Sequence, residues 1–475
     1  MAAASHRARL KFISRCRTIC HLVIRRTTFR NLNYQRIKWI ALAVGTLLAF
    51  TNLRTIRQSL DVPYAYFKDF TYDYISAKAS LNGEDPYVDA QTLTRRHLAE
   101  SPVTIPDHPS SHTPVSISLV APLAAILTYR QAAIAWCLIE LLLIACCAFL
   151  FWQENGERKG WRLWMPVAVT SFLFLGWGPV KDEIGNGQWT IVLLALLMVC
   201  QRALRTGRSA LGGVALGAAM AVKLSGAPIL IFLTMRKRWR AVGWATFTAA
   251  LCNLLAAGFI GWPAMMQYYL RIGAEVTHIY RAAGHNYALW TLGWRVFEGS
   301  LAHSVIGFSA PPLFNAPQLA RPASIAVCGL VLLVGLWLAR QLDDREEAYG
   351  ILIHLTLLLN PVSWTYHIPL TIIPLSMTYA LLKRQSFPRK ETIFCILLLT
   401  IISLPFSAIL AMQQSFGAAD SGVAAGVRIS FPVGMLSLAP AASLAGLTVL
   451  LYHLTQRQDR SSGAQTAPPE HRPAG

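Results

Sequence analysis

The chain has 475 residues, of which 54% are hydrophobic and only 14% are charged. Soluble proteins carry about 25% charged residues, so this composition excludes an ordinary soluble enzyme and indicates a membrane protein. The formal net charge is +20, but the basic residues cluster between apolar segments, as cytoplasmic loops require, which argues against nucleic-acid binding. The nine cysteines form no CxxC pair, so we expect small core residues and neither disulfides nor metal ligands.

The two ends of the chain differ from its apolar middle. Residues 1–38 are rich in Arg and Lys and contain no acid, which predicts a basic cytoplasmic arm lying on anionic lipid. Residues 39–53 form the first apolar span, and we expect one transmembrane domain over 39–455. The segment 456–475 ends in a run rich in Ser, Pro, Gln and Gly, which predicts a disordered cytoplasmic tail.

Many further apolar runs follow the first span. They are 115–128, 131–151, 163–180, 189–203, 209–222, 225–235, 241–260, 322–340, 349–360, 368–382, 391–411 and 431–453. The basic clusters between them can all be cytoplasmic only if 115–128, interrupted by Pro114 and Pro122, is a re-entrant or interfacial piece and 286–309 belongs to an outside loop. We therefore expect an all-α polytopic bundle of about twelve spans, with both termini inside and interfacial helices in the outer loops.

This topology places the informative polar segments on one side of the membrane. They are 54–130, 181–188, the helix end at Lys223, 261–321, 360–367 and 412–430. The opposite side consists of basic loops. One-sided polarity favours a site open to the extracytoplasmic side over a transport path with gates on both faces.

The first outer loop carries carboxylates among aromatic residues. The turn residues at Gly83 and Pro86 predict a short interfacial helix over 71–81. Asp69 and Asp73, four residues apart, would share one face of a helix, where two carboxylates can act as base and orienting group. They can also bind a divalent ion, although two carboxylates alone make a poor site. The alternative is an aromatic belt with solvated acids.

Four other segments offer polar side chains for chemistry. Lys223 ends an apolar helix, where it either snorkels to headgroups or binds phosphate. The glycines of 185–188 precede a span and can present backbone N–H groups to an anion. Asn286 and Arg295 lie among aromatics and suit phosphate or the membrane interface equally. His367 follows Asn360 at the outer end of an apolar run and is either structural or a donor to phosphate.

Together these residues favour group transfer from a phosphate-bearing lipid to a hydroxyl acceptor, with cations holding the leaving phosphate and an Asp taking the proton. Two other classes stay open. A transporter or flippase of lipid-linked sugars would need polar residues at mid-span. A ligase or polymerase similar to O-antigen enzymes would act on lipid-linked glycans through Arg and His in a late loop.

An ordered series of short motifs resembles glycosyltransferase family 87. It comprises Asp69-Phe70, Tyr74, Ala77, Gly83, Asp85-Pro86-Tyr87, Pro122-Leu123, Gly187-Gln188, Gly212-Gly213, Lys223, Pro228, Arg238-Trp239-Arg240, Asn286, Leu289, Arg295, Asn360-Pro361, Ser363-Trp364 and His367. The resemblance covers residues 60–370. Members of this family are polytopic GT-C enzymes that use polyprenyl-phosphate sugars, and they include a mannosyltransferase of phosphatidylinositol mannoside assembly.

The resemblance implies an inverting transfer of one sugar, with mannose the leading expectation, from a polyprenyl-phosphate donor to a lipid or glycan acceptor. It implies an inner-membrane enzyme whose site faces the periplasm, with no cofactor required and a divalent metal left open. Asp69 matches the position of the catalytic base. Positions matching the donor-phosphate site and cavity are Gln188, Lys223, Asn286, Arg295 and His367, with Asp73 and Tyr74 as accessory residues. The chain departs from the family pattern at Asp73, Ala288, Thr365 and Tyr366.

Overall fold

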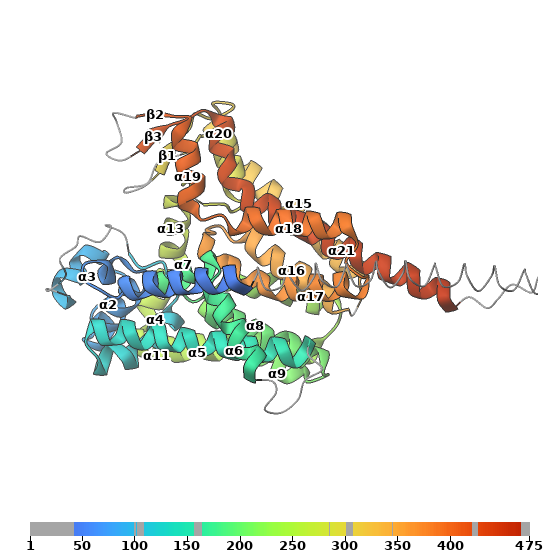
Figure 1. The fold of residues 1–475 in the computed structure, drawn as a ribbon. Helices are drawn as coiled ribbons and strands as arrows, with labels where there is room; N and C mark the ends of the chain where they lie inside the picture. Colours follow the sequence, from blue (N-terminus) through green and yellow to red (C-terminus); the bar gives the residue numbers. More distant parts are fainter. Residues whose placement is uncertain are drawn as a thin grey trace, which may run out of the picture.

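The computed structural model describes residues 42–98, 101, 109–155, 164–284, 286–300, 307–343, 345–419 and 426–466. Almost all secondary structure in these residues is helical, as the sequence predicts. Figure 1 shows the long helices running side by side in roughly one direction, with α2 (Phe70–Leu81) and α3 (Ala90–His97) gathered at one end. The predicted basic arm 1–38 lies outside the described residues.

The first half of the chain builds the bundle around the first outer loop. A helix at 42–58 is followed by η1 (Tyr64–Phe67), α2, α3, α4 (Pro114–Ile126), α5 (Tyr129–Asn155), α6 (Trp164–Leu175), α7 (Gly178–Asn186), α8 (Thr190–Arg205), α9 (Ser209–Val222), η3 (Leu224–Gly226), α10 (Ala227–Met235) and α11 (Trp239–Ile260). Helix α2 ends at Asn82 and Gly83, whose φ of +73° favours glycine, so the predicted boundary is confirmed.

The second half alternates long helices with loop elements. It contains α12 (Trp262–Gln267), η4 (Tyr268–Ile272), α13 (Gly273–Ile279), α14 (Thr291–Phe297), β1 (Gly307–Ser309), α15 (Pro317–Gln341), α16 (Glu346–Leu359), η5 (Thr365–Thr371), α17 (Ile372–Arg384), α18 (Arg389–Ser403), α19 (Phe406–Ser415), β2 (Ala418–Ala419), β3 (Gly426–Arg428), α20 (Phe431–Met435), η6 (Leu436–Leu438) and α21 (Ala439–Thr466). Residues 456–466 of the predicted tail belong to α21, contrary to our expectation of disorder, and 467–475 are outside the described residues.

The described helices that are able to cross a membrane are fewer than the predicted twelve spans. Four helices are long and apolar enough to cross, and two bent pairs, α7 with α8 and α18 with α19, bring the total to six. Helices α4, α6 and α9 are apolar but shorter. The chain is a polytopic helical membrane protein, and the count of twelve stays a prediction. Helix α4 is not interrupted at Pro122, contrary to our expectation, because the helix continues through this residue.

Three short strands accompany the helices of this predominantly α-helical fold. β1 pairs with β3 in parallel, and β2 pairs with β3 antiparallel. Phe308 is fully buried there with Ala310, Leu410 and Ile429 in a small apolar cluster. This sheet ties the loop 261–321 to the loop 412–430, which the sequence places on the same side of the membrane.

The two ends of the bundle are separated by the lengths of the central helices. Helix α8 begins next to Gln188 and ends at Arg205, and its 16 residues span ~24 Å. Helix α16 runs in the opposite direction, from Glu346 to the loop at Asn360. The polar outer segments therefore meet at one end of the bundle, and the basic turns lie at the other.

Candidate active site

Asp69 is the N-cap residue of α2, and its carboxylate faces donors from two distant segments. Gln188 Nε2 donates a hydrogen bond to Asp69 Oδ2, and the Tyr366 hydroxyl donates to the same carboxylate. Burial, with a smaller contribution from the Asp69 charge, raises the pKa of Tyr280 to about 12. Asp69 itself is only partly buried. The carboxylate is thus oriented yet reachable, which a general base requires.

The turn between α7 and α8 delivers Gln188 to this position. Gly187 has φ of +63°, and a Cβ at this residue would lie 2.8 Å from the Cβ of Phe70. Glycine therefore permits both the left-handed turn and the close approach to α2. The Gly187 and Gln188 N–H groups donate to the carbonyls of Ile184 and Glu183 (3.2 and 3.3 Å). These two N–H groups already have acceptors, which favours the tight turn over an anion site at Gly187 and Gln188.

Asp73 is fully buried and serves a different purpose from Asp69. Its Oδ2 accepts a hydrogen bond from Trp189 Nε1 (2.9 Å), and its Oδ1 lies 2.7 Å from His112 Nδ1. These contacts join α2 to the start of α8 and to the loop before α4. Tyr74 is also buried, and its hydroxyl donates to the Leu127 carbonyl (2.9 Å). The structure therefore gives both accessory residues a packing role and separates Asp73 from Asp69.

Lys223 and His367 meet directly across the site. Lys223 is the C-cap of α9, and its Nζ lies 2.6 Å from His367 Nε2. The Trp364 N–H donates to His367 Nδ1 (3.0 Å). Because Nδ1 accepts this bond, a neutral imidazole carries its proton on Nε2, which faces Lys223.

The electrostatics of this pair favour binding of an anion. Burial and the Lys223 charge hold the pKa of His367 well below its usual value, so the ring is neutral. Burial also lowers the pKa of Lys223 to about 8, against the opposing effect of the Glu183, Asp69 and Asp73 carboxylates. Lys223 and His367 therefore place two N–H donors side by side. A phosphate oxygen bound next to the pair would accept from both.

Arg295 and Asn286 lie behind the site and hold its loops. The buried Arg295 guanidinium donates to Ser437 Oγ (2.5 Å) and to the carbonyls of Asn286 (2.6 Å) and Gly284 (3.2 Å), with longer bonds to two more carbonyls. Asn286 donates to the Pro361 carbonyl (2.9 Å) and accepts from the Ser363 N–H (2.9 Å). These residues fix the segment that carries His367. The Arg295 Nη groups and the Asn286 amide bond to other parts of the protein, whereas Arg295 Nε has no hydrogen-bond partner among the described residues.

Three further residues belong to the site although sequence reasoning did not select them. Tyr366 bonds to Asp69, His112 pairs with Asp73, and Glu183 is fully buried and accepts a hydrogen bond from the Ile191 N–H (3.1 Å). The sequence contained one signal: Tyr366 adjoins His367 and departs from the family pattern. His112 and Glu183 become visible only when the chain folds. Within the described part of the chain, no group of three His, Cys, Asp or Glu side chains is placed to hold a metal ion.

A helical membrane protein that gathers a carboxylate, a lysine and a neutral histidine at one end of its bundle has the parts that a lipid-dependent transferase needs. Residues 111–361, more than half of the chain, match the model of Glycosyltransferase family 87. The chain belongs to this family. The matched segment includes Gln188, Lys223, Asn286 and Arg295, whereas Asp69 and His367 lie outside it.

Two curated relatives carry one name, "Polyprenol-phosphate-mannose-dependent alpha-(1-2)-phosphatidylinositol mannoside mannosyltransferase". The protein from Mycolicibacterium smegmatis is 24% identical over 343 residues, which cover 67% of this chain and 71% of the relative. The protein from Mycobacterium tuberculosis is 27% identical over 281 residues, which cover 54% of this chain and 61% of the relative. No solved structure matches the chain.

Proposed function

We propose that the protein transfers a mannosyl group, with inversion, from a polyprenyl-phosphate donor to a hydroxyl of a lipid or glycan acceptor. The names of the two relatives support mannose and the polyprenyl-phosphate donor. The clustering of polar loops at one end of the bundle supports a site at the extracytoplasmic face of the inner membrane. The twelve-span GT-C topology, with 1–38 and the tail on the cytoplasmic side, is part of this proposal.

The observation that carries the proposal is the junction at Tyr366 and His367. Tyr366 bonds to Asp69, and its neighbour His367 contacts Lys223. One short segment thus connects a carboxylate with a pair of anion-binding groups. Group transfer from a phosphate ester needs these two functions at adjacent points.

In the proposed reaction Asp69 takes the proton of the acceptor hydroxyl. The acceptor oxygen forms a bond to the anomeric carbon while the bond from that carbon to the phosphate oxygen breaks. The electron pair of the broken bond stays on the phosphate, which leaves as polyprenyl phosphate. Lys223 Nζ and His367 Nε2–H hold the charge that develops there.

The donor class can be tested with purified protein in lipid nanodiscs. The assay offers polyprenyl-phosphate mannose, its glucose and arabinose analogues, and a lipid-diphosphate glycan, each with a membrane-lipid extract as acceptor. We expect sugar transfer from the mannose monophosphate and none from the diphosphate glycan. Transfer from the diphosphate alone would contradict the proposal and favour a ligase.

A further inference from the structure

A cavity lies at the end of the bundle opposite to Asp69. Its volume is 720 Å³, within the range of small-molecule sites. Its walls come from the ends of α8, α10, α16 and α17 and from the turns beside them. Since α8 alone separates the two ends by ~24 Å, this cavity is not part of the transferase site.

The cavity combines an apolar wall with a basic one. Phe232, Leu233, Leu352 and Met377 contribute buried apolar side chains. The charged lining residues are five arginines against three carboxylates: Arg205, Arg236, Arg238, Arg345 and Arg384, and Asp343, Glu346 and Glu347. The lining therefore has an excess of positive charge. A cavity with one apolar wall and one basic wall fits a ligand that has an acidic headgroup and an apolar chain.

Arginines at this cavity form ion pairs with neighbouring carboxylates, and Arg345 pairs with Asp459. Arg205 Nη1 lies 3.2 Å from Glu346, and Arg236 Nη1 lies 3.4 Å from Asp343, whose side chain is 82% exposed. Exposed pairs of this kind are weak, so a phosphate can compete for the guanidinium groups. Arg384 makes no side-chain hydrogen bond or ion pair within the described residues.

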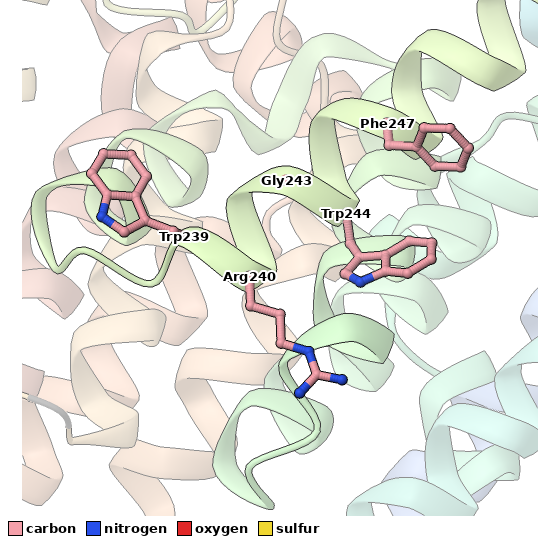
Figure 2. Close-up of a pocket in the computed structure, with 5 residues that line it drawn as sticks. All are labelled: Trp239, Arg240, Gly243, Trp244 and Phe247. Carbon is pink, nitrogen blue, oxygen red and sulfur yellow. The ribbon is translucent and has the colours of Figure 1, made fainter.

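Neighbouring residues place the cavity at a membrane–water boundary. Trp239 and Trp244 on the first turns of α11 are 61% and 42% exposed. Figure 2 shows both indoles projecting from the helix, with the Arg240 side chain between them, around a separate hollow of 340 Å³. Exposed Trp beside Arg is typical of the headgroup level of a bilayer. Lys237 and Arg340 line a third hollow next to the cavity and add to the positive field.

We propose that this cavity binds the phosphate headgroup of an anionic glycerophospholipid, such as phosphatidylglycerol. The phosphate contacts the arginines, and the first part of an acyl chain lies against Phe232 and Met377. Bound lipid then connects turns that are distant in sequence, at Arg205, Arg236, Arg345 and Arg384. The bound state of the protein is therefore more stable than the empty state.

Thermal unfolding in nanodiscs tests this site. The full-length protein is compared in phosphatidylcholine alone and in phosphatidylcholine with phosphatidylglycerol, and separately in phosphatidylcholine with inorganic phosphate. We expect phosphatidylglycerol to raise the midpoint temperature and inorganic phosphate to leave it unchanged. If inorganic phosphate produces the same rise, the cavity is a site for free anions and the lipid proposal is wrong.

Two variants separate the cavity from general surface charge. Arg384→Glu reverses one lining charge, and Ala380→Trp fills the cavity, whereas Lys390→Glu makes the same charge change outside the lining. We expect at least a tenfold loss of lipid affinity in the first two and none in the third. Native mass spectrometry of the detergent-purified proteins gives an independent count of retained phosphatidylglycerol. Equal retention in all four proteins would overturn the proposal.

Discussion

At the level of single residues, the site depends on groups whose ordinary protonation is disturbed. Lys223 Nζ and His367 Nε2 lie 2.6 Å apart. Because Lys223 is charged below a pH of about 8, both groups are hydrogen-bond donors there and neither can accept from the other. A bound phosphate oxygen accepts from both groups and favours the charged form of Lys223.

This arrangement predicts a pH dependence of kcat/KM for the donor. Because burial lowers the pKa of Lys223 to about 8, the amine of the free enzyme is charged below that pH and neutral above it. We expect kcat/KM to fall as pH rises past about 8. Lys223→Met should lower kcat/KM roughly 10- to 100-fold near neutral pH, as loss of a charged hydrogen bond implies, and should remove the fall.

Initial rates measured from about pH 6.5 to 9.5 check this prediction, since kcat/KM reports the free enzyme. Lys78→Met serves as the matched control, because Lys78 lies on the last turn of α2 with its Nζ 5.9 Å from the centre of the Tyr74 ring. An unchanged alkaline fall in the Lys223 variant would show that another group titrates.

At the level of elements, close packing of two helices positions Lys223 in the site. Gly213 and Gly217 form a GxxxG pair on α9, and Cβ atoms there would lie 2.3 Å from the carbonyl oxygens of Ala241 and Ala245 on α11. Helices α9 and α11 are therefore in backbone contact. Since Lys223 ends α9, its place depends on this contact.

Gly217→Ala should therefore be destabilising, because the added methyl group has no room. We expect a loss of about 1–3 kcal/mol in unfolding free energy, the usual cost of overpacking. The comparison is Gly258→Ala in α11, where a Cβ meets no atom within 4 Å. Thermal unfolding in detergent measures both variants. Equal midpoint temperatures of unfolding for Gly217→Ala and Gly258→Ala would refute the close approach of α9 and α11.

Sequence patterns predicted some elements and missed others for physical reasons. Helix α2 was predictable because Gly83 and Pro86 mark its end. The strands were not, since each has at most three residues and forms only between distant loops. The sequence pattern singled out Asp69 as a candidate site residue. Its contacts with Gln188 and Tyr366 were not predictable, because these residues come from other segments and no local pattern indicates such contacts. Arg295 looked like a phosphate ligand because sequence cannot show that its two Nη groups already donate to other parts of the protein.

At the level of the whole molecule, contacts divide the loops into the two sets that charge predicted. The outer loops meet through Asp69 with Gln188 and Asn286 with Ser363. The basic turns meet at the other end through Arg205 with Glu346 and Arg457 with Glu391. Loop charge therefore identified which segments are neighbours, although the number of spans is not confirmed.

The proposed orientation can be checked by reporter fusions. Fusion of alkaline phosphatase after Phe416, in the loop between α19 and β2, should give an active enzyme, because this loop is proposed to be periplasmic. Green fluorescent protein fused after residue 475 should fluoresce in the cytoplasm. The reverse pair of results would place the site on the cytoplasmic side.

The central claim is that Asp69 is the base of a mannosyl transfer. Its most direct test is the transfer rate of Asp69→Asn from polyprenyl-phosphate mannose, compared with wild type and with Asp61→Asn, a control on an exposed side chain. We predict a fall in kcat of about 10²- to 10⁴-fold for Asp69→Asn, as loss of a general base implies, and an unchanged rate for the control. A wild-type rate in Asp69→Asn would contradict the account.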